Sequence, residues 1–420
     1  MESGTDPLSS DLPSRQSGQR SQGQWFNHGA RRLLILLGLL AIVLVSFPLS
    51  AQIKQVAQAP PRTEIRGVWM TNVDSDVLFN PDRLRQGVQE LARLNFNTLY
   101  PVVWNWGYTT YPSAILRTAI SAPVDPRPDN LVGRDSLAEL VEVGHQHKMA
   151  VIPWFEFGFM VPEDSAMALR HPDWLTQKRN GDQTWQEGKY PRVWLNPFLP
   201  EVQQFVRGLI LEIVTNYQVD GIQFDDHFGL PVEFGYDAYT VQLYQREHGG
   251  KAPPANPNDP EWMRWRANKI TGFLSQIFRD IKSRNTQLIV GLSPNNYDFA
   301  YNHSLQDWRL WERNGLIEEL VLQVYQNNLS SFNRQLAAPE IQDSRRHIPT
   351  GIGILTGLKP KPVPMRQIQE QVQAVRRQNF AGVSFFFYES LWKLTQESAD
   401  SRKAGFQSVF PTPAPRPDIS

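Results

Sequence analysis

The sequence of 420 residues contains no cysteine. This absence excludes disulfide bonds, a thiolate nucleophile, cysteine-ligated metals and a lipoprotein anchor attached to cysteine. It does not define the compartment, because proteins inside and outside the cytoplasm both occur without cysteine. Catalytic chemistry in this chain must therefore use oxygen or nitrogen side chains.

The sequence also lacks an excess of charge of either sign, since 42 Lys and Arg residues balance 42 Asp and Glu residues. Binding to nucleic acid or to a membrane surface by charge needs a basic excess. We therefore expect no nucleic-acid partner. Hydrophobic residues make up 41% of the chain and aromatic residues 11%, enough for a barrel-sized core.

The N-terminal region carries a targeting pattern. Arg31 and Arg32 precede an uncharged apolar run over residues 33–47, which is typical of an export signal. We interpret residues 1–51 as an export signal that is either cleaved or retained as a signal anchor, and 52–63 as a polar linker. The stretch 33–53 is long enough to tether the chain to the inner membrane. We expect an exported protein, periplasmic or at the cell surface.

Strand-like and helical patterns alternate through the rest of the chain. Apolar residues at Leu84, Val88 and Leu91 show the helical spacing found between the strands. The strand-like runs cover residues 64–71, 98–103, 150–155, 221–224, 288–293, 320–325, 348–355 and 382–387. This alternation predicts a (β/α)₈ TIM barrel over residues 64–397, followed by a proline-rich tail over 398–420. An open doubly wound sheet competes, but no glycine-rich phosphate loop follows the first strand.

The long loops all follow strands, at residues 104–134, 156–200 and 225–261, whereas segments that precede strands are short. They therefore build up the C-terminal face, where barrel enzymes place their active sites. Trp104, Trp106 and Trp194 lie in these loops. Their flat rings predict stacking platforms for sugars.

Asp225 and Asp226 directly follow the fourth strand-like run. Two adjacent acids repel each other, which separates their pKa values and lets one hold a proton while the other is ionised. An acid and a carboxylate together are what cleavage of a glycosidic bond requires. We therefore predict Asp225 and Asp226 as catalytic residues.

Other polar residues end the strands of the predicted barrel. Glu156 ends the third strand and is a third catalytic candidate, and Glu389 follows the eighth as an alternative second carboxylate. The predicted substrate-binding residues are Arg66, Asn72, Trp104, Trp106, Trp194, His227, Asn295, Gln323, Tyr325 and Glu389. His227 has no second ligand at the spacing i, i+4. We expect neither a metal nor a cofactor.

Several short segments carry a family resemblance. They are Glu-Ile-Arg-Gly-Val-Trp at 64–69, Trp-Leu-Asn-Pro at 194–197, Val-Asp-Gly-Ile-Gln-Phe-Asp-Asp at 219–226, Leu-Ser-Pro at 292–294 and Gln-Val-Tyr at 323–325. Together they resemble the bacterial glycosyl hydrolase-like 10 proteins. The similarity covers about residues 63–390. It implies a barrel glycosidase of the cell envelope, with members that act on peptidoglycan glycan strands stripped of their stem peptides.

A more distant resemblance bears on the mechanism. Chitinase-type enzymes carry Asp-x-x-Asp-x-Asp-x-Glu on the fourth strand, and here the frame places His227 where the terminal acid stands. Adjacent Asp-Asp pairs also occur in hexosaminidases whose substrate acetamido group is the nucleophile. Three hypotheses stay open: a hydrolase of an amino-sugar-containing envelope glycan, a non-catalytic carbohydrate-binding or scaffolding barrel, and an α-glucan hydrolase.

Overall fold

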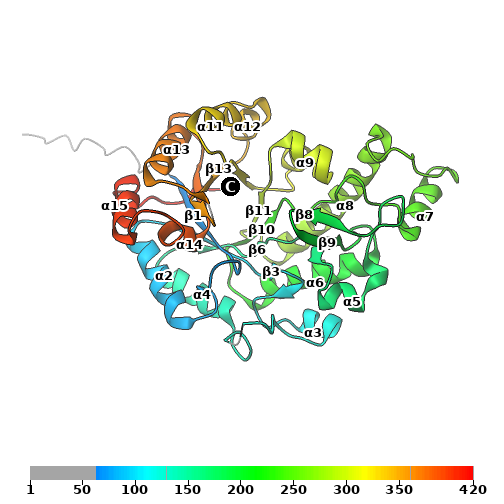
Figure 1. The fold of residues 1–420 in the computed structure, drawn as a ribbon, viewed down its shortest axis with the longest axis horizontal. Coiled ribbons are helices and arrows are strands. Elements are labelled where there is room, and N and C mark those ends of the chain that lie inside the picture. Colours follow the sequence, from blue (N-terminus) through cyan, green and yellow to red (C-terminus); the bar gives the residue numbers. More distant parts are fainter. Residues whose placement is uncertain (1–62, 129, 360, 420) are drawn as a thin grey trace, which may run out of the picture. The chain divides into compact units, whose positions relative to one another are not determined.

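The structure is a computed structural model that describes residues 63–128, 130–359 and 361–419. Its centre is a sheet of parallel strands with helices outside it (Figure 1). The strands are β1 (Ile65–Met70), β2 (Thr98–Pro101), β5 (Ala150–Val151), β6 (Trp154–Phe155), β10 (Gly221–Asp225), β11 (Ile289–Ser293), β12 (Glu319–Gln323), β13 (Thr350–Leu355) and β16 (Gly382–Phe386). Each corresponds to a run predicted from the sequence.

The third predicted strand closes the barrel. It is split into β5 and β6 around Pro153, which has no N–H to donate to a neighbouring strand. The order of the sheet is β5-β2-β1-β16-β13-β12-β11-β10-β6, so the two halves of this one strand form its two edges. β5 pairs with β2, and β6 pairs with β10. The prediction of a (β/α)₈ barrel is confirmed.

The helices begin where the sequence offers capping groups. The side chain of Asn80 accepts hydrogen bonds from the backbone N–H groups of Asp82 and Arg83 at the start of α2. The helices are α2 (Pro81–Arg93), α3 (Ala114–Ile120), α4 (Ser136–Gln146), α5 (Ala166–Arg170), α6 (Pro200–Asn216), α7 (Ala238–Glu247), α8 (Pro260–Arg284), α9 (Tyr297–Ser304), α10 (Trp308–Arg313), α11 (Leu329–Leu336), α12 (Pro339–Ser344), α13 (Met365–Arg377), α14 (Tyr388–Trp392) and α15 (Ala399–Val409), with a short 3₁₀ turn at Pro172–Trp174.

Large side chains fill the inside of the barrel. The indole N–H of Trp69 donates to Oε1 of Gln223 at 2.7 Å, and the hydroxyl of Tyr100 donates to Oε1 of Glu319 at 2.7 Å. Gly67 makes room for this packing, because a Cβ at position 67 would lie 2.6 Å from the Tyr100 ring. The interior is therefore a packed core, and any substrate must bind at its mouth.

The insertions at the carboxyl ends of the strands form small sheets of their own. β3 (Trp104–Asn105) pairs with β4 (Tyr108–Thr109), β7 (Met160–Pro162) and β8 (Trp185–Glu187) both pair with β9 (Tyr190–Trp194), and β14 (Gly357–Leu358) pairs with β15 (Lys361–Pro362). The predicted concentration of long loops on this face is confirmed. The hairpin of β8 and β9 is drawn in green in Figure 1.

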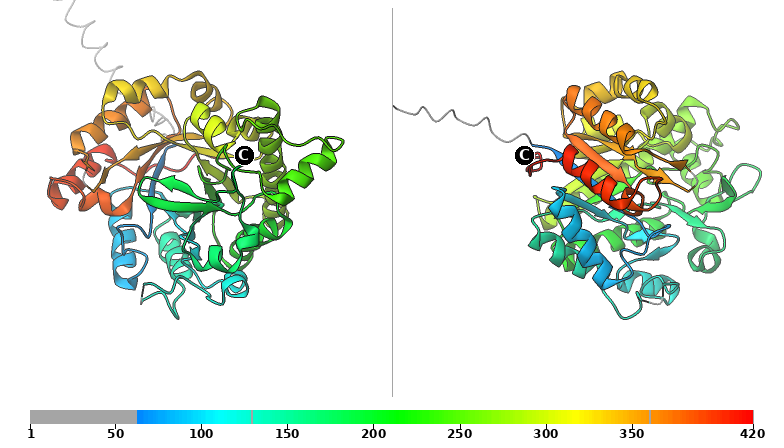
Figure 2. Two further views of the ribbon diagram at one scale, coloured as in Figure 1. Left: turned by 45° about the vertical axis from the view of Figure 1, so that its right-hand side comes forward. Right: turned by 60° about the vertical axis from the view of Figure 1, so that its left-hand side comes forward.

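The C-terminal segment differs from the predicted tail over 398–420. Residues 399–409 form α15, whose Phe406 is fully buried against Phe96, Phe385 and Trp392. Figure 2 shows α15 in red beside the orange α13. The apolar residues of this short helix show little helical periodicity. The helix is buried only through contacts with segments distant in the sequence.

Residues beyond α15 pack against the amino ends of the barrel strands. The carbonyl oxygens of Thr412, Ala414 and Pro415 accept hydrogen bonds from Arg66, Asn97 and Glu64. The guanidinium of Arg416 pairs with Glu319 inside the barrel. The last ten described residues therefore close the end of the barrel opposite to the predicted site.

The predictions for the N-terminal region concern an export signal at 1–51, a linker at 52–63 and a tether at 33–53. Apart from Thr63, these residues lie outside the described part of the chain. Among the described residues, no helix is long and apolar enough to cross a membrane.

Candidate active site

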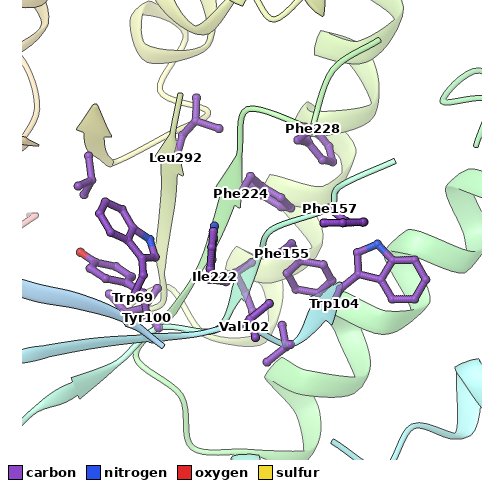
Figure 3. Packing of buried hydrophobic residues seen from close by; sticks show 14 of the residues in the cluster. Trp69, Tyr100, Val102, Trp104, Phe155, Phe157, Ile222, Phe224, Phe228 and Leu292 are labelled. Carbon is purple, nitrogen blue, oxygen red and sulfur yellow. The ribbon is translucent and has the colours of Figure 1, made fainter. Parts of the chain in front are cut away.

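Glu156 and Asp225 meet at the mouth of the barrel because their strands are paired in register. Trp154 lies opposite Gln223 and Phe155 opposite Phe224, so the next residues on the two strands are Glu156 and Asp225. Side chains alternate along a strand, and those of Phe155 and Phe224 lie together in the core (Figure 3). The two acids therefore take the other side, toward the barrel axis.

Asp225 is held in place by three N–H donors. Trp154 Nε1 donates to Oδ2, and both Gln323 Nε2 and the backbone N–H of Asp226 donate to Oδ1, at 2.7 and 2.6 Å. The residue is only 2% exposed. Burial and then the negative charge of Asp226 raise the pKa of the Asp225 carboxyl well above its usual value. This rigid position suits a residue that orients its neighbours.

Asp226 is more accessible and faces a cavity. Asn295 Nδ2 donates to its Oδ2 at 2.6 Å, and Nδ1 of His227 lies 3.2 Å from its Oδ1. The same Nδ1 lies 3.0 Å from the backbone carbonyl oxygen of Glu156. A carbonyl oxygen only accepts, so Nδ1 of His227 carries a proton and orients the Asp226 carboxylate.

Burial and neighbouring negative charges favour the protonated form of Glu156 over the effect of its hydrogen-bond donors. Its Oε2 accepts from Asn105 Nδ2 at 2.7 Å and from Thr71 Oγ1 at 3.2 Å. Burial raises the pKa of Glu156 to about 8; the hydrogen bond from Thr71 opposes this, and the negative charges of Glu187 and Asp226 add to it. A carboxylic acid with this pKa is suited to proton donation.

Tyr325 completes this group of residues. Burial and then the charges of Asp225, Asp226 and Glu156 raise the pKa of its hydroxyl well above the usual value. The ring stacks on Phe386 with centroids 5.4 Å apart. The hydroxyl thus remains a neutral hydrogen-bond donor beside three acids.

The structure brings most of the predicted site residues together. Asn72 joins the group because its Oδ1 accepts from Asn105 Nδ2 at 2.7 Å. The residues that converge on the mouth are Glu156, Asp225, Asp226, Asn72, His227, Asn295, Gln323 and Tyr325.

Arg66 is not part of this site, contrary to the prediction. It stands near the start of β1, at the opposite end of the barrel, where its guanidinium donates to Glu64 and to the carbonyl oxygen of Thr412. Its guanidinium also lies over the Phe410 ring, 4.6 Å from the centroid. Substrate at the mouth cannot reach it, and its role is to hold the C-terminal segment.

Glu389 forms ion pairs outside this group, and its predicted roles as substrate ligand and second carboxylate stay predictions. It is 2% exposed and pairs with Arg83 at 3.1 Å and Lys393 at 2.9 Å. Its polar surroundings include Asp76, which also pairs with Arg83. Two cations compensate its buried charge, and it links α14 to α2.

The three predicted tryptophan platforms have different surroundings. Trp104 is 1% exposed, donates to the carbonyl oxygen of Gly158, and packs among the core rings in Figure 3. It is a core residue, because the short β3–β4 hairpin turns it inward. Trp106 is partly exposed, with the guanidinium groups of Arg127 and Arg192 over its ring. Trp194 is 3% exposed and presents only a small part of its surface to a cavity.

Two residues that donate hydrogen bonds to the acids of the site were not predicted from the sequence. Trp154 lies in the strand-like run 150–155, where nothing local indicates that its indole N–H donates to Asp225. Asn105 stands between Trp104 and Trp106 in the sequence. In the structure it is fully buried and donates to both Asn72 and Glu156. The only sequence feature that could have indicated their role is their position near the carboxyl ends of strands. Asn105 has this position in common with Asn72.

Three neighbouring side chains offer atoms that could hold a metal ion. One ligand atom from each of Asp225, Asp226 and His227 lies within 4.8 Å of the others. However, both oxygens of Asp225 already accept from N–H groups. The oxygens of a metal ligand must face the ion. In this structure the oxygens of Asp225 face N–H groups, which favours their role as hydrogen-bond acceptors.

A barrel with acids and polar groups at the carboxyl ends of its strands is the architecture of barrel glycosidases. The sequence profile described as glycosyl hydrolase-like 10 matches residues 64–375. The chain therefore belongs to the glycosyl hydrolase-like 10 family, as the sequence resemblance predicted.

Curated relatives and solved structures agree with this assignment. The glycosyl hydrolase DigH of Escherichia coli K12 is 25% identical over 349 residues, covering 70% of this chain and 74% of the relative. The glycosyl hydrolase YngK of Bacillus subtilis 168 is 22% identical over 329 residues, covering 68% of this chain and 58% of the relative.

Two solved structures share the fold. The PgaB (BpsB) glycoside hydrolase domain from Bordetella bronchiseptica is 14% identical with a TM-score of 0.57, covering 80% of this chain and 100% of that one. The catalytic domain of the β-amylase from Paenibacillus polymyxa is 9% identical with a TM-score of 0.57, covering 84% of this chain and 99% of that one. At this identity the likeness concerns the fold alone.

Proposed function

We propose that this protein is a glycoside hydrolase of the cell envelope that cleaves an amino-sugar-containing polysaccharide, namely the glycan strands of peptidoglycan. Membership of a glycosyl hydrolase-like family supports the reaction class. The basic pair and apolar run near the N-terminus support export to the envelope, with residues 33–53 as a tether when the signal is retained.

One observation carries the proposal: the carboxyl groups of Glu156 and Asp226 share the mouth of the barrel, and burial raises the pKa of the first. The pKa of Glu156 is raised to about 8, and the charge of Asp226 contributes to that shift. His227 contacts both residues through one nitrogen. A binding module needs aromatic rings and hydrogen bonds but gains nothing from a carboxyl held protonated near neutral pH.

The residues divide the reaction between them. Glu156 donates its proton to the oxygen that leaves with the departing sugar. The acetamido oxygen of the substrate attacks the anomeric carbon, with the Asp226 carboxylate orienting the acetamido N–H. Water then attacks the same carbon and returns a proton to Glu156, which restores the acid. Asp225 positions Asp226 through the hydrogen bond to its backbone N–H.

The test is hydrolysis of purified peptidoglycan strands, with and without stem peptides, by the full-length protein. Mass spectrometry of the products should show cleaved glycan for the wild type and none for Glu156→Gln. Strand binding without any cleavage would reject the proposal in favour of a carbohydrate-binding barrel. Cleavage of an α-glucan, with the strands left intact, would reject it in favour of an α-glucan hydrolase.

A further inference from the structure

A cavity of about 350 Å³ opens beside Asp226 at the mouth of the barrel. This volume lies at the lower end of the range for small-molecule sites, roughly 300–1,000 Å³. It suits one sugar unit better than a long segment of glycan. The lining residues include Trp185, Glu187, Asp226, Glu233, Asn295 and Phe299.

Aromatic rings from two elements line this cavity. Trp185 of the β8–β9 hairpin meets Trp194 edge to face, with centroids 5.7 Å apart. Phe299 of α9 stacks on His303 with centroids 4.5 Å apart, and it is 44% exposed. An exposed phenyl ring backed by an imidazole offers an apolar surface to a flat ligand. Phe299 was not predicted from the sequence.

The charge of the cavity has one sign. Asp226, Glu187 and Glu233 line it, whereas no Lys or Arg occurs among its described lining residues. The guanidinium of Arg192 pairs with Glu187 at 2.8 Å and compensates one of these charges, but its own side chain is only 6% exposed. A negatively charged ligand would meet three carboxylates here and no exposed cationic side chain of Lys or Arg among the described lining residues.

From this combination we propose that the cavity is a subsite for one hexosamine that is uncharged or cationic, and that it rejects a hexosamine carrying a free carboxylate. Phe299 stacks on the ring of the bound sugar. The carboxylates and Asn295 accept hydrogen bonds from its hydroxyl and nitrogen substituents. The inference rests on the proposed function and adds to it the identity of one sugar beside Asp226.

The subsite has a consequence for any strand that alternates neutral and carboxylated hexosamines. Such a strand has two kinds of glycosidic bond. Because the neutral sugar always occupies the cavity, the enzyme cleaves only one of them. All products then carry the same type of sugar at their new reducing end. Borohydride labelling of the products reveals that sugar, and a mixture of both types would contradict the subsite.

The direct experiment is an NMR titration of the full-length protein with three monosaccharides. They have the same pyranose ring and differ only in their substituents. We expect glucosamine and N-acetylglucosamine to bind at least about tenfold more tightly than N-acetylmuramic acid, because of like-charge repulsion. The double variant Glu187→Gln with Glu233→Gln should reduce this difference to within about threefold. Glu142→Gln, a matched change on the exposed side of α4, should leave the difference unchanged.

Phe299→Ala tests the stacking surface. It should weaken binding of both neutral and cationic sugars by about tenfold, whereas Leu169→Ala, at a 71% exposed side chain outside the cavity, should not. Equal or tighter binding of N-acetylmuramic acid, or no effect of Phe299→Ala, would overturn the inference. Strand hydrolysis is measured separately. Hydrolysis without sugar discrimination rejects the subsite alone, and discrimination without hydrolysis rejects the proposed function alone.

Discussion

Asp225 and Glu156 occupy adjacent positions at the ends of two paired strands, β10 and β6, although they lie 69 residues apart in the sequence. Because β6 is the second half of a strand interrupted at Pro153, this pairing also closes the barrel. The same contact therefore completes the fold and assembles the acids.

Asp226→Asn should lower kcat by about 10²–10⁴-fold without lowering the melting temperature, because the side chain faces the cavity and keeps its size. Asp225→Asn should lower kcat and also destabilise the fold. Its amide N–H₂ would replace one carboxylate oxygen and face either the N–H of Trp154 or the N–H groups of Gln323 and Asp226. Steady-state kinetics and thermal unfolding of both variants measure these effects. Wild-type rates in Asp226→Asn would remove that residue from the mechanism.

Activity should fall as the pH rises through about 8, where Glu156 loses the proton it donates. Glu187→Gln removes a negative charge that raises this pKa, so the alkaline limb should move to lower pH. Thr71→Val removes a hydrogen bond that favours the ionised form, so the limb should move to higher pH. Profiles of kcat/KM against pH measure both shifts; shifts in the same direction would exclude Glu156 as the acid.

Trp104→Ala should destabilise the protein by about 3–5 kcal/mol, because it leaves a cavity in the core. Binding of glycans of any length should change little in the folded protein, as Trp104 is only 1% exposed. Trp106→Ala provides the comparison, since its ring is partly exposed and lies under the guanidinium of Arg192, which pairs with Glu187. Chemical denaturation and calorimetric binding separate the two effects. Loss of long-glycan affinity at unchanged stability would restore Trp104 as a platform.

A thiazoline mimic of the cyclised acetamido intermediate should bind far more tightly than the parent sugar, because it resembles the high-energy species. The products should retain the anomeric configuration. Inhibition constants and NMR of early products measure these outcomes. Inverted product, or rapid cleavage of a glycan without acetamido groups, would replace substrate assistance by a scheme with two protein carboxylates.

Arg416→Ala should destabilise the barrel by about 3–5 kcal/mol, because it leaves Glu319 charged, 1% exposed and without its cation. The double variant Arg416→Met with Glu319→Gln should recover most of that loss, since no buried charge remains. Denaturation midpoints test both variants. Hydrolysis of peptidoglycan strands at low temperature should be unaffected, because Arg416 and Glu319 lie at the end of the barrel opposite to the acids. Unchanged stability in Arg416→Ala would show that the C-terminal segment is dispensable.

Local sequence patterns are sufficient to predict the barrel, the face that carries the long loops and the position of Glu156 and the Asp225–Asp226 pair. These features depend on local periodicity and on the rule that parallel strands gather their carboxyl ends on one face. Side-chain partners were decided by the tertiary structure. Trp104 turned into the core, Arg66 and Glu389 took distant or ionic partners, and Trp154 reached Asp225 across 71 residues. Those contacts join segments far apart in the chain, so no local pattern records them.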